Sequence, residues 1–118
     1  MVRFIWDNHS DKRLSRLALQ SEEYRALTAA FPQLAELLKN QVESMVHAVN
    51  NYNVHPYEIR NNEIQYVDND SVNSKLNFGY STAFASCYEY DRGKISEANY
   101  NKNINIIINN NNYNNNNN

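Results

Sequence analysis

The sequence of 118 residues has few of the residues that build disulfides or membrane spans. Cys87 is the only cysteine, so no disulfide can form within the chain and nothing points to an oxidising compartment. No apolar run approaches the ~20 residues that cross a bilayer. The early charges in Met1–Asp7 do not fit a signal peptide. We therefore expect a cytoplasmic protein without a membrane partner.

The chain also lacks a block of basic residues. Residues 1–51 carry six basic and six acidic side chains, and residues 52–98 carry four basic and seven acidic ones. Without a basic block, the overall field of the protein does not attract a phosphate backbone. RNA is therefore a less favoured partner than another protein.

The residue types that carry chemistry form no recognisable motif. Cys87 would need a histidine as its base, and none of the three histidines lies in a local motif with it. The separations of His9, His47 and His55 match no common zinc spacing. The chain also lacks a phosphate-binding loop. The sequence therefore predicts no catalytic residue, no metal ion and no cofactor.

The first half of the chain predicts a strand followed by helices. Val2–Trp6 is a short β-branched and aromatic run before turn-forming residues, which is typical of a strand. Ser10 then offers a helix N-cap, and apolar residues recur at helical spacing as far as Leu27. Ser21 with two glutamates after it is a second start signal. One kinked helix and two short helices both fit this pattern.

A longer helix is expected to begin near Pro32 and to end near Asn50. Its apolar residues form a stripe that needs a partner surface. If that stripe is partly uncovered, it would allow a homodimer. The stripe consists of Leu34, Leu37, Leu38, Val42, Met45, Val46 and Val49.

The second half of the chain changes to the pattern of strands. Tyr57–Arg60 and Glu63–Val67 flank Asn61-Asn62, which predicts a tight hairpin because asparagine tolerates positive φ. Between residues 78 and 90, aromatic residues recur at even positions and small residues at odd ones, as in a strand with one aromatic face. The aromatic residues are Phe78, Tyr80, Phe84, Tyr88 and Tyr90.

This aromatic face is the best candidate for binding, and it has two interpretations. If it is exposed on a sheet, it would stack single-stranded bases or form a protein-binding patch. If it is covered by the helices, it forms the core, because a sheet must bury one face. The core is the favoured interpretation, although each tyrosine hydroxyl needs a partner or a place at the rim.

The last twenty residues, Asn99–Asn118, use only Asn, Ile, Lys and Tyr, all of which can be encoded by codons of A and T alone. This low-complexity composition predicts a disordered tail, apart from an edge strand that residues 103–108 would be able to add. Residues 1–98 are then one α+β domain. We expect a short N-terminal strand and two or three helices packed on an antiparallel sheet of three to five strands.

With no catalytic set, the sequence favours a non-enzymatic interaction protein, such as an inhibitor, an immunity protein or a regulatory factor with a protein partner. The order of a strand, a helix pair and antiparallel strands is similar to that of RelE/ParE-type toxins. That resemblance implies cleavage of ribosome-bound RNA or binding of gyrase, but no set of Arg, Lys, His or Tyr residues carries it over. RNA binding through the aromatic face is a further alternative. The last alternative is a diverged or truncated gene product without selected function.

Overall fold

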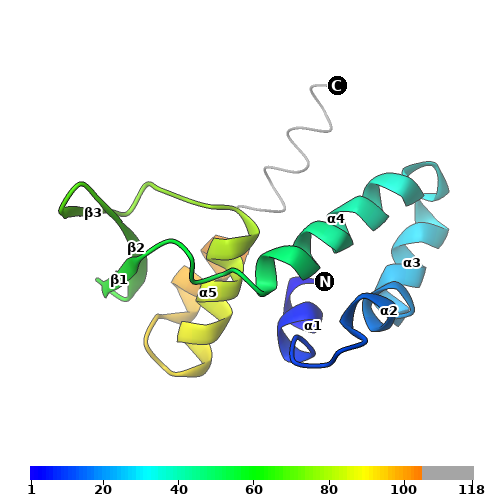
Figure 1. The fold of residues 1–118 in the computed structure, drawn as a ribbon, viewed down its shortest axis with the longest axis horizontal. Helices are drawn as coiled ribbons and strands as arrows, with labels where there is room; N and C mark the ends of the chain where they lie inside the picture. The colour runs from blue at the N-terminus through cyan, green and yellow to red at the C-terminus, as the bar shows by residue number, and fades with distance from the viewer. Residues whose placement is uncertain (105–118) are drawn as a thin grey trace. The chain divides into compact units, whose positions relative to one another are not determined.

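The computed structural model describes residues 1–104 and divides into two compact units, Met1–Asn51 and a second unit that begins at Tyr52 (Figure 1). The first unit is helical, and the second combines an antiparallel sheet with helices. The predicted α+β class is therefore confirmed, as is a sheet within the predicted range of strands. The expected disorder of the tail concerns residues that lie mostly outside the described part, and the single domain over residues 1–98 stays a prediction.

The first unit consists of four helices and one 3₁₀ turn. In chain order these are α1 (Val2–Asp7), α2 (Leu14–Leu19), α3 (Glu22–Ala30), η1 (Pro32–Leu34) and α4 (Ala35–Val49). Of the two alternatives for the segment after residue 10, two separate short helices are the correct one. The long helix begins and ends close to the predicted residues.

The predicted N-terminal strand was wrong, because these residues form α1. Ile5 and Trp6 are both buried, with 0% and 9% of their surface exposed. Consecutive residues of a strand point to opposite faces, whereas in a helix they lie about 100° apart and can face the same neighbours. An ion pair of 3.1 Å between Arg3 and Asp7, four residues apart, adds a local contact that only a helix provides.

The core of the first unit lies where α4 packs against α1 and α2. We expected the stripe of this helix to pack on a sheet, and within its own unit these two helices cover it instead. Burial is confined to the C-terminal half of the stripe. The buried apolar residues of the unit are Ile5, Trp6, Leu14, Ala18, Val42, Met45 and Val49.

The sheet of the second unit contains β1 (Tyr57–Arg60), β2 (Glu63–Asp68) and β3 (Ser71–Asn73), in that spatial order and antiparallel. The predicted hairpin is confirmed. Asn61 and Asn62 form its two-residue turn with φ values of 54° and 61°, the positive values that a tight turn of this kind requires.

The segment predicted as the aromatic strand is a helix, α5 (Tyr80–Asp91), so that prediction was wrong. Residues 82–87 are all buried, and α5 packs on β2. A strand with one covered face would leave every second one of these residues exposed. Gly79 and Gly93, with φ of 65° and 72°, lie just before and just after the helix, where the left-handed conformation favours glycine.

The core of the second unit joins the inner face of the sheet to α5 and to the chain after it. A helix covers residues 97–104, so Asn103 and Ile104 belong to a helix and not to the expected edge strand, whose other residues lie outside the described ones. The buried apolar cluster is Ile64, Tyr66, Ala85 and Ile95, with Tyr52, Tyr57, Ile59, Leu76, Tyr90 and Tyr100 packed around it.

Candidate functional site

The five aromatic residues of the predicted binding face do not share one face. On a helix, residues two positions apart are rotated by about 200°, so alternation in the sequence distributes them around α5. Phe84 is completely buried, and Tyr88 and Tyr90 are half-buried. Phe78 lies before the helix and exposes 39% of its surface. The described residues therefore contain no continuous stacking platform made of these five.

These aromatic side chains have separate partners. The stacked or tilted ring pairs are Phe78 with His55 at 3.7 Å, Tyr90 with Tyr100 at 4.4 Å, and Tyr88 with Tyr52 at 5.8 Å between centroids. The Arg92 guanidinium also lies 4.9 Å from the centre of the Tyr88 ring, which is within the range of a cation–π contact. Each pair ties a loop or a terminal segment of the second unit to its core, so packing accounts for their positions.

The polar centre of the second unit is a carboxylate that no pattern in the sequence predicted. Glu89 lies on α5 with 6% of its surface exposed. The Tyr57 hydroxyl donates a hydrogen bond of 2.6 Å to its Oε2, and Nη1 of Arg92 lies 3.5 Å from its Oε1. A buried carboxylate needs such donors, because an unpaired charge in the interior is costly. Glu89 is therefore held by partners from the sheet and from the end of its own helix.

The same contacts determine the protonation of the tyrosines around it. Burial raises the pKa of Tyr57 strongly, and the hydrogen bond to Glu89 and the charge of its carboxylate raise it further. Burial also raises the pKa of Tyr52. For Tyr66, burial raises the pKa while the hydrogen bond with Thr82 acts in the opposite direction. The Tyr57 hydroxyl is thus a protonated donor to Glu89 at neutral pH, not a base or a nucleophile.

The remaining reactive side chains are dispersed. Cys87 is buried, and its Sγ lies 4.0 Å from the Tyr100 hydroxyl. His9 stacks on Trp6 at 4.3 Å in the first unit, whereas His55 belongs to the second. Among residues 1–104, no three His, Cys, Asp or Glu side chains come together in a way that would hold a metal ion.

One hollow of about 430 Å³ lies on the outer face of the sheet, across β1 and the β2–β3 hairpin. Arg60 is the basic residue of its lining and is already paired with Glu58 at 2.8 Å. The hollow therefore offers no concentration of one charge to a ligand. Its lining residues are Glu58, Arg60, Val67, Asp70, Ser71 and Val72.

The strongest candidate for a functional surface lies in the first unit, where α3 turns through η1 into α4. Phe31, Leu34 and Leu37 expose 47%, 36% and 38% of their surface. Leu27 is half-buried at the preceding turn of α3. Backbone hydrogen bonds of 2.9 Å from Phe31 to Leu27 and from Leu34 to Phe31 keep these residues adjacent. We call these four residues the hairpin-tip surface, after the helical hairpin that α3 and α4 form.

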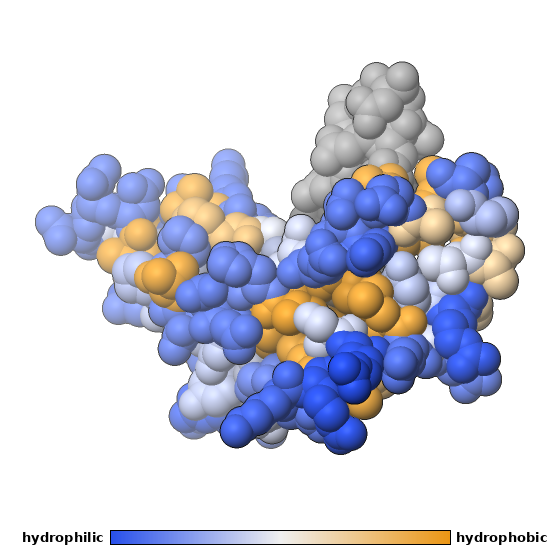
Figure 2. All heavy atoms as spheres, turned by 45° about the vertical axis from the view of Figure 1, so that its right-hand side comes forward, coloured by the Kyte–Doolittle hydropathy of each residue, from blue (hydrophilic) through white to orange (hydrophobic). Residues whose placement is uncertain are grey.

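The two helices at this end leave their apolar side chains uncovered to different extents. No residue of α3 is buried, and the buried residues of α4 begin only at Val42. Figure 2 shows apolar side chains among polar ones at this end of the first unit. Arg25, Glu36 and Lys39 are exposed around it. An apolar centre with a charged rim of mixed sign is the usual composition of a protein-binding surface.

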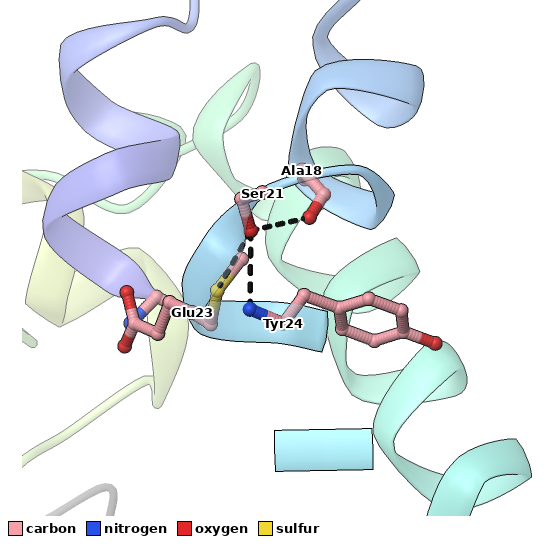
Figure 3. Close-up of polar contacts among 5 residues, drawn as sticks. Ala18, Ser21, Glu23 and Tyr24 are labelled. Carbon is pink, nitrogen blue, oxygen red and sulfur yellow. Dashed lines mark hydrogen bonds and ion pairs between the residues drawn. The ribbon is translucent and has the colours of Figure 1, made fainter. Parts of the chain in front are cut away.

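Local hydrogen bonds hold α3 in place without burial. The Ser21 Oγ accepts the backbone N–H of Tyr24 at 3.2 Å and donates to the Ala18 carbonyl at 2.7 Å (Figure 3). Glu22 and Glu23 follow in the first turn, where negative charge interacts favourably with the helix dipole. The sequence predicted this start, and the structure confirms it.

The sequence placed Leu34 and Leu37 in the apolar stripe of the long helix and left open how much of it is covered, and the structure leaves these two residues exposed. The angular position of Leu37 around the helix axis is the signal that distinguishes it from the buried residues. It lies five residues before Val42, which rotates it by about 140° from that buried residue on a helix of 3.6 residues per turn. Leu38, one residue later, lies close to the centre of the stripe and is half-buried.

Comparison of the chain with protein-family models, with curated proteins and with solved structures gives no significant match. Within the part of the chain that the structure describes, no helix has both the length and the apolar composition needed to span a bilayer. The geometry of the site is thus the basis for a functional hypothesis.

Proposed function

We propose that the protein is a small non-enzymatic interaction protein that binds another protein through the hairpin-tip surface. The observation that carries this proposal is the absence of any buried residue in α3, next to three large apolar side chains exposed between residues 31 and 37. A partner that covers them would remove apolar surface from water, which favours association. An inhibitor, an immunity protein or a regulatory factor would act in this way.

Aromatic side chains are enriched at the centre of such surfaces, and a few buried anchors that enter a pocket of the partner contribute most of the binding free energy. Phe31 is the most exposed of the three large side chains, so we expect it to be the anchor. The polar rim would set the orientation of the partner and the rate of association. The cytoplasm remains the proposed location, on the evidence of the single cysteine.

The test compares two charge substitutions in the full chain, Leu37→Asp at the hairpin tip and Val54→Asp at an exposed valine of the second unit. Leu37 and Val54 expose 38% and 65% of their surface, so neither change should lower the free energy of unfolding by more than about 0.5 kcal/mol. We expect Leu37→Asp to weaken binding of the partner at least about tenfold, the effect of ~1.4 kcal/mol at a central contact. Val54→Asp should bind normally.

The partner is first isolated by affinity purification from a lysate of the source cells, with and without nuclease. A stoichiometric protein that survives nuclease and is lost with Leu37→Asp alone supports the proposal. Retention of that protein by both variants would assign binding to another surface. Partners lost on nuclease treatment would instead favour the RNA-directed alternative, and non-cooperative unfolding of the purified chain would favour a product without selected function.

A further inference from the structure

The hydrogen bonds between β1 and β2 show which residues of β1 direct their backbone groups to β2 and which direct them to the edge of the sheet. Val67 donates its backbone N–H to the Pro56 carbonyl at 3.0 Å, and these residues continue the register that places Tyr57 opposite Tyr66. Bonded and non-bonded pairs alternate along an antiparallel ladder. Every second residue of β1 after Pro56 therefore bonds to β2, and the residues between them direct their backbone groups to the other side.

The residues whose backbone groups point away from β2 are Tyr57 and Ile59. Their N–H and C=O groups lie along the free edge of the sheet, since β1 is its outermost strand. Among residues 1–104, no backbone hydrogen bond engages these four groups. A row of unpaired donors and acceptors of this kind is a template for a strand of another chain.

The side chains along this edge indicate which strand fits. Glu58 and Arg60 lie on the same, outer face and expose 48% and 58% of their side-chain surface. They are paired with each other at 2.8 Å. Charges of a single sign would keep two such edges apart. Opposite charges two positions apart are self-complementary when the same strand is placed antiparallel to itself.

We propose that β1 pairs with β1 of a second copy of the chain, antiparallel and with Ile59 opposite Ile59 of the other copy. In this register the Ile59 residues exchange two backbone hydrogen bonds. Glu58 of each copy then lies opposite Arg60 of the other, at non-bonded positions, where side chains of facing residues approach most closely.

The charges also exclude the neighbouring registers. A shift that places Glu58 opposite Glu58 of the other copy, or Arg60 opposite Arg60, brings like charges together at the centre of the contact. Only the register centred on Ile59 forms two opposite-charge pairs, which the two-fold axis makes identical. The two sheets, each of three strands, would join into one of six. The proposal rests on the second unit and is independent of the hairpin-tip surface.

The test uses the full chain and measures its mass by sedimentation over a range of concentrations. We expect the unaltered chain to form dimers, and Glu58→Lys or Arg60→Glu alone to raise the dimer dissociation constant at least about tenfold. A mixture of the two variants should form a heterodimer, because the lysine introduced in one variant then faces the glutamate introduced in the other, and the remaining Arg60 faces the remaining Glu58. Damage to either variant's own fold cannot be repaired by mixing, so recovery in the mixture identifies the cross-strand pairs.

Hydrogen exchange gives an independent measurement. The Tyr57 and Ile59 amides should become protected as the concentration of the chain rises, while the Glu58 amide, already bonded to β2, should not change. A chain that stays monomeric at all concentrations would overturn the proposal and show that the charges protect the edge. A dimer that is indifferent to both variants, or a mixture that does not recover, would overturn it as well.

Discussion

Helices α3 and α5 are stabilised in opposite ways. In α5, seven of twelve residues are buried, including Phe84, which has no exposed surface. In α3, none of the nine residues is buried. Its polar interactions lie at its N-terminus, namely the Ser21 cap, the glutamates of its first turn, and an ion pair of 2.6 Å between Glu23 and the N-terminal ammonium group of Met1. One helix thus depends on burial in a core, and the other depends on polar contacts at its start.

This difference explains which helix the sequence could predict. The start of α3 is encoded by residues adjacent to it, so it was found at the correct place. The residues of α5 are small or aromatic and alternate in the sequence, and its helical state is favoured by burial against β2. Tertiary packing outweighs such weak local preferences. A short apolar and aromatic segment therefore cannot be assigned to strand or helix from periodicity alone.

The largest expected effect concerns Phe84. We expect Phe84→Ala to lower the free energy of unfolding by about 3–5 kcal/mol, because it leaves a cavity in place of a completely buried ring. Leu27→Ala, in a half-buried position of α3, should cost less than half as much. Urea unfolding followed by circular dichroism measures both changes. Equal losses would show that α3 depends on tertiary packing as much as α5 does.

A smaller effect is expected at the hydroxyl that binds Glu89. Tyr57→Phe leaves this buried carboxylate without its 2.6 Å donor, which should cost about 1–3 kcal/mol near neutral pH. The pKa of Tyr57 is raised in the folded state. The stability linked to that proton is therefore complete below pH 10, the ordinary tyrosine value, and decreases as the pH rises above it.

The difference in stability between the unaltered chain and Tyr57→Phe should accordingly become smaller above pH 10. Urea titrations at neutral and alkaline pH measure it. The other tyrosines titrate in both proteins and serve as an internal control. A difference that stays constant at alkaline pH would mean that the Tyr57 proton is not coupled to folding.

The smallest expected effect is at the cap of α3. Ser21→Ala removes the acceptor for the Tyr24 N–H and should cost about 1 kcal/mol, whereas Ser21→Gly should cost only a few tenths. Hydrogen exchange of the α3 amides measures the change directly. If the two variants exchange at the same rate as the unaltered chain, the cap is not what maintains this uncovered helix.

The candidate surface shows the same limit of sequence reasoning as the fold. The long helix and its apolar residues were predictable from the spacing alone. Which part of the stripe is covered was not predictable, because it depends on where α1 and α2 end against α4. The shared binding face of Phe78, Tyr80, Phe84, Tyr88 and Tyr90 assumed a strand, whereas four of the five lie on a helix, which distributes them around its axis. The Asn61-Asn62 hairpin was predictable because its turn is determined by two adjacent residues.

The position of Trp6 makes the two units optically distinct. It is the single tryptophan of the chain, and it is buried in α1 against the His9 ring. Its emission therefore reports on the surroundings of α1, in the unit where Tyr24 is the only tyrosine. The near-ultraviolet signal of the remaining tyrosines follows the second unit. Fluorescence and dichroism recorded on one sample would thus show whether the two halves of this chain melt together or one after the other.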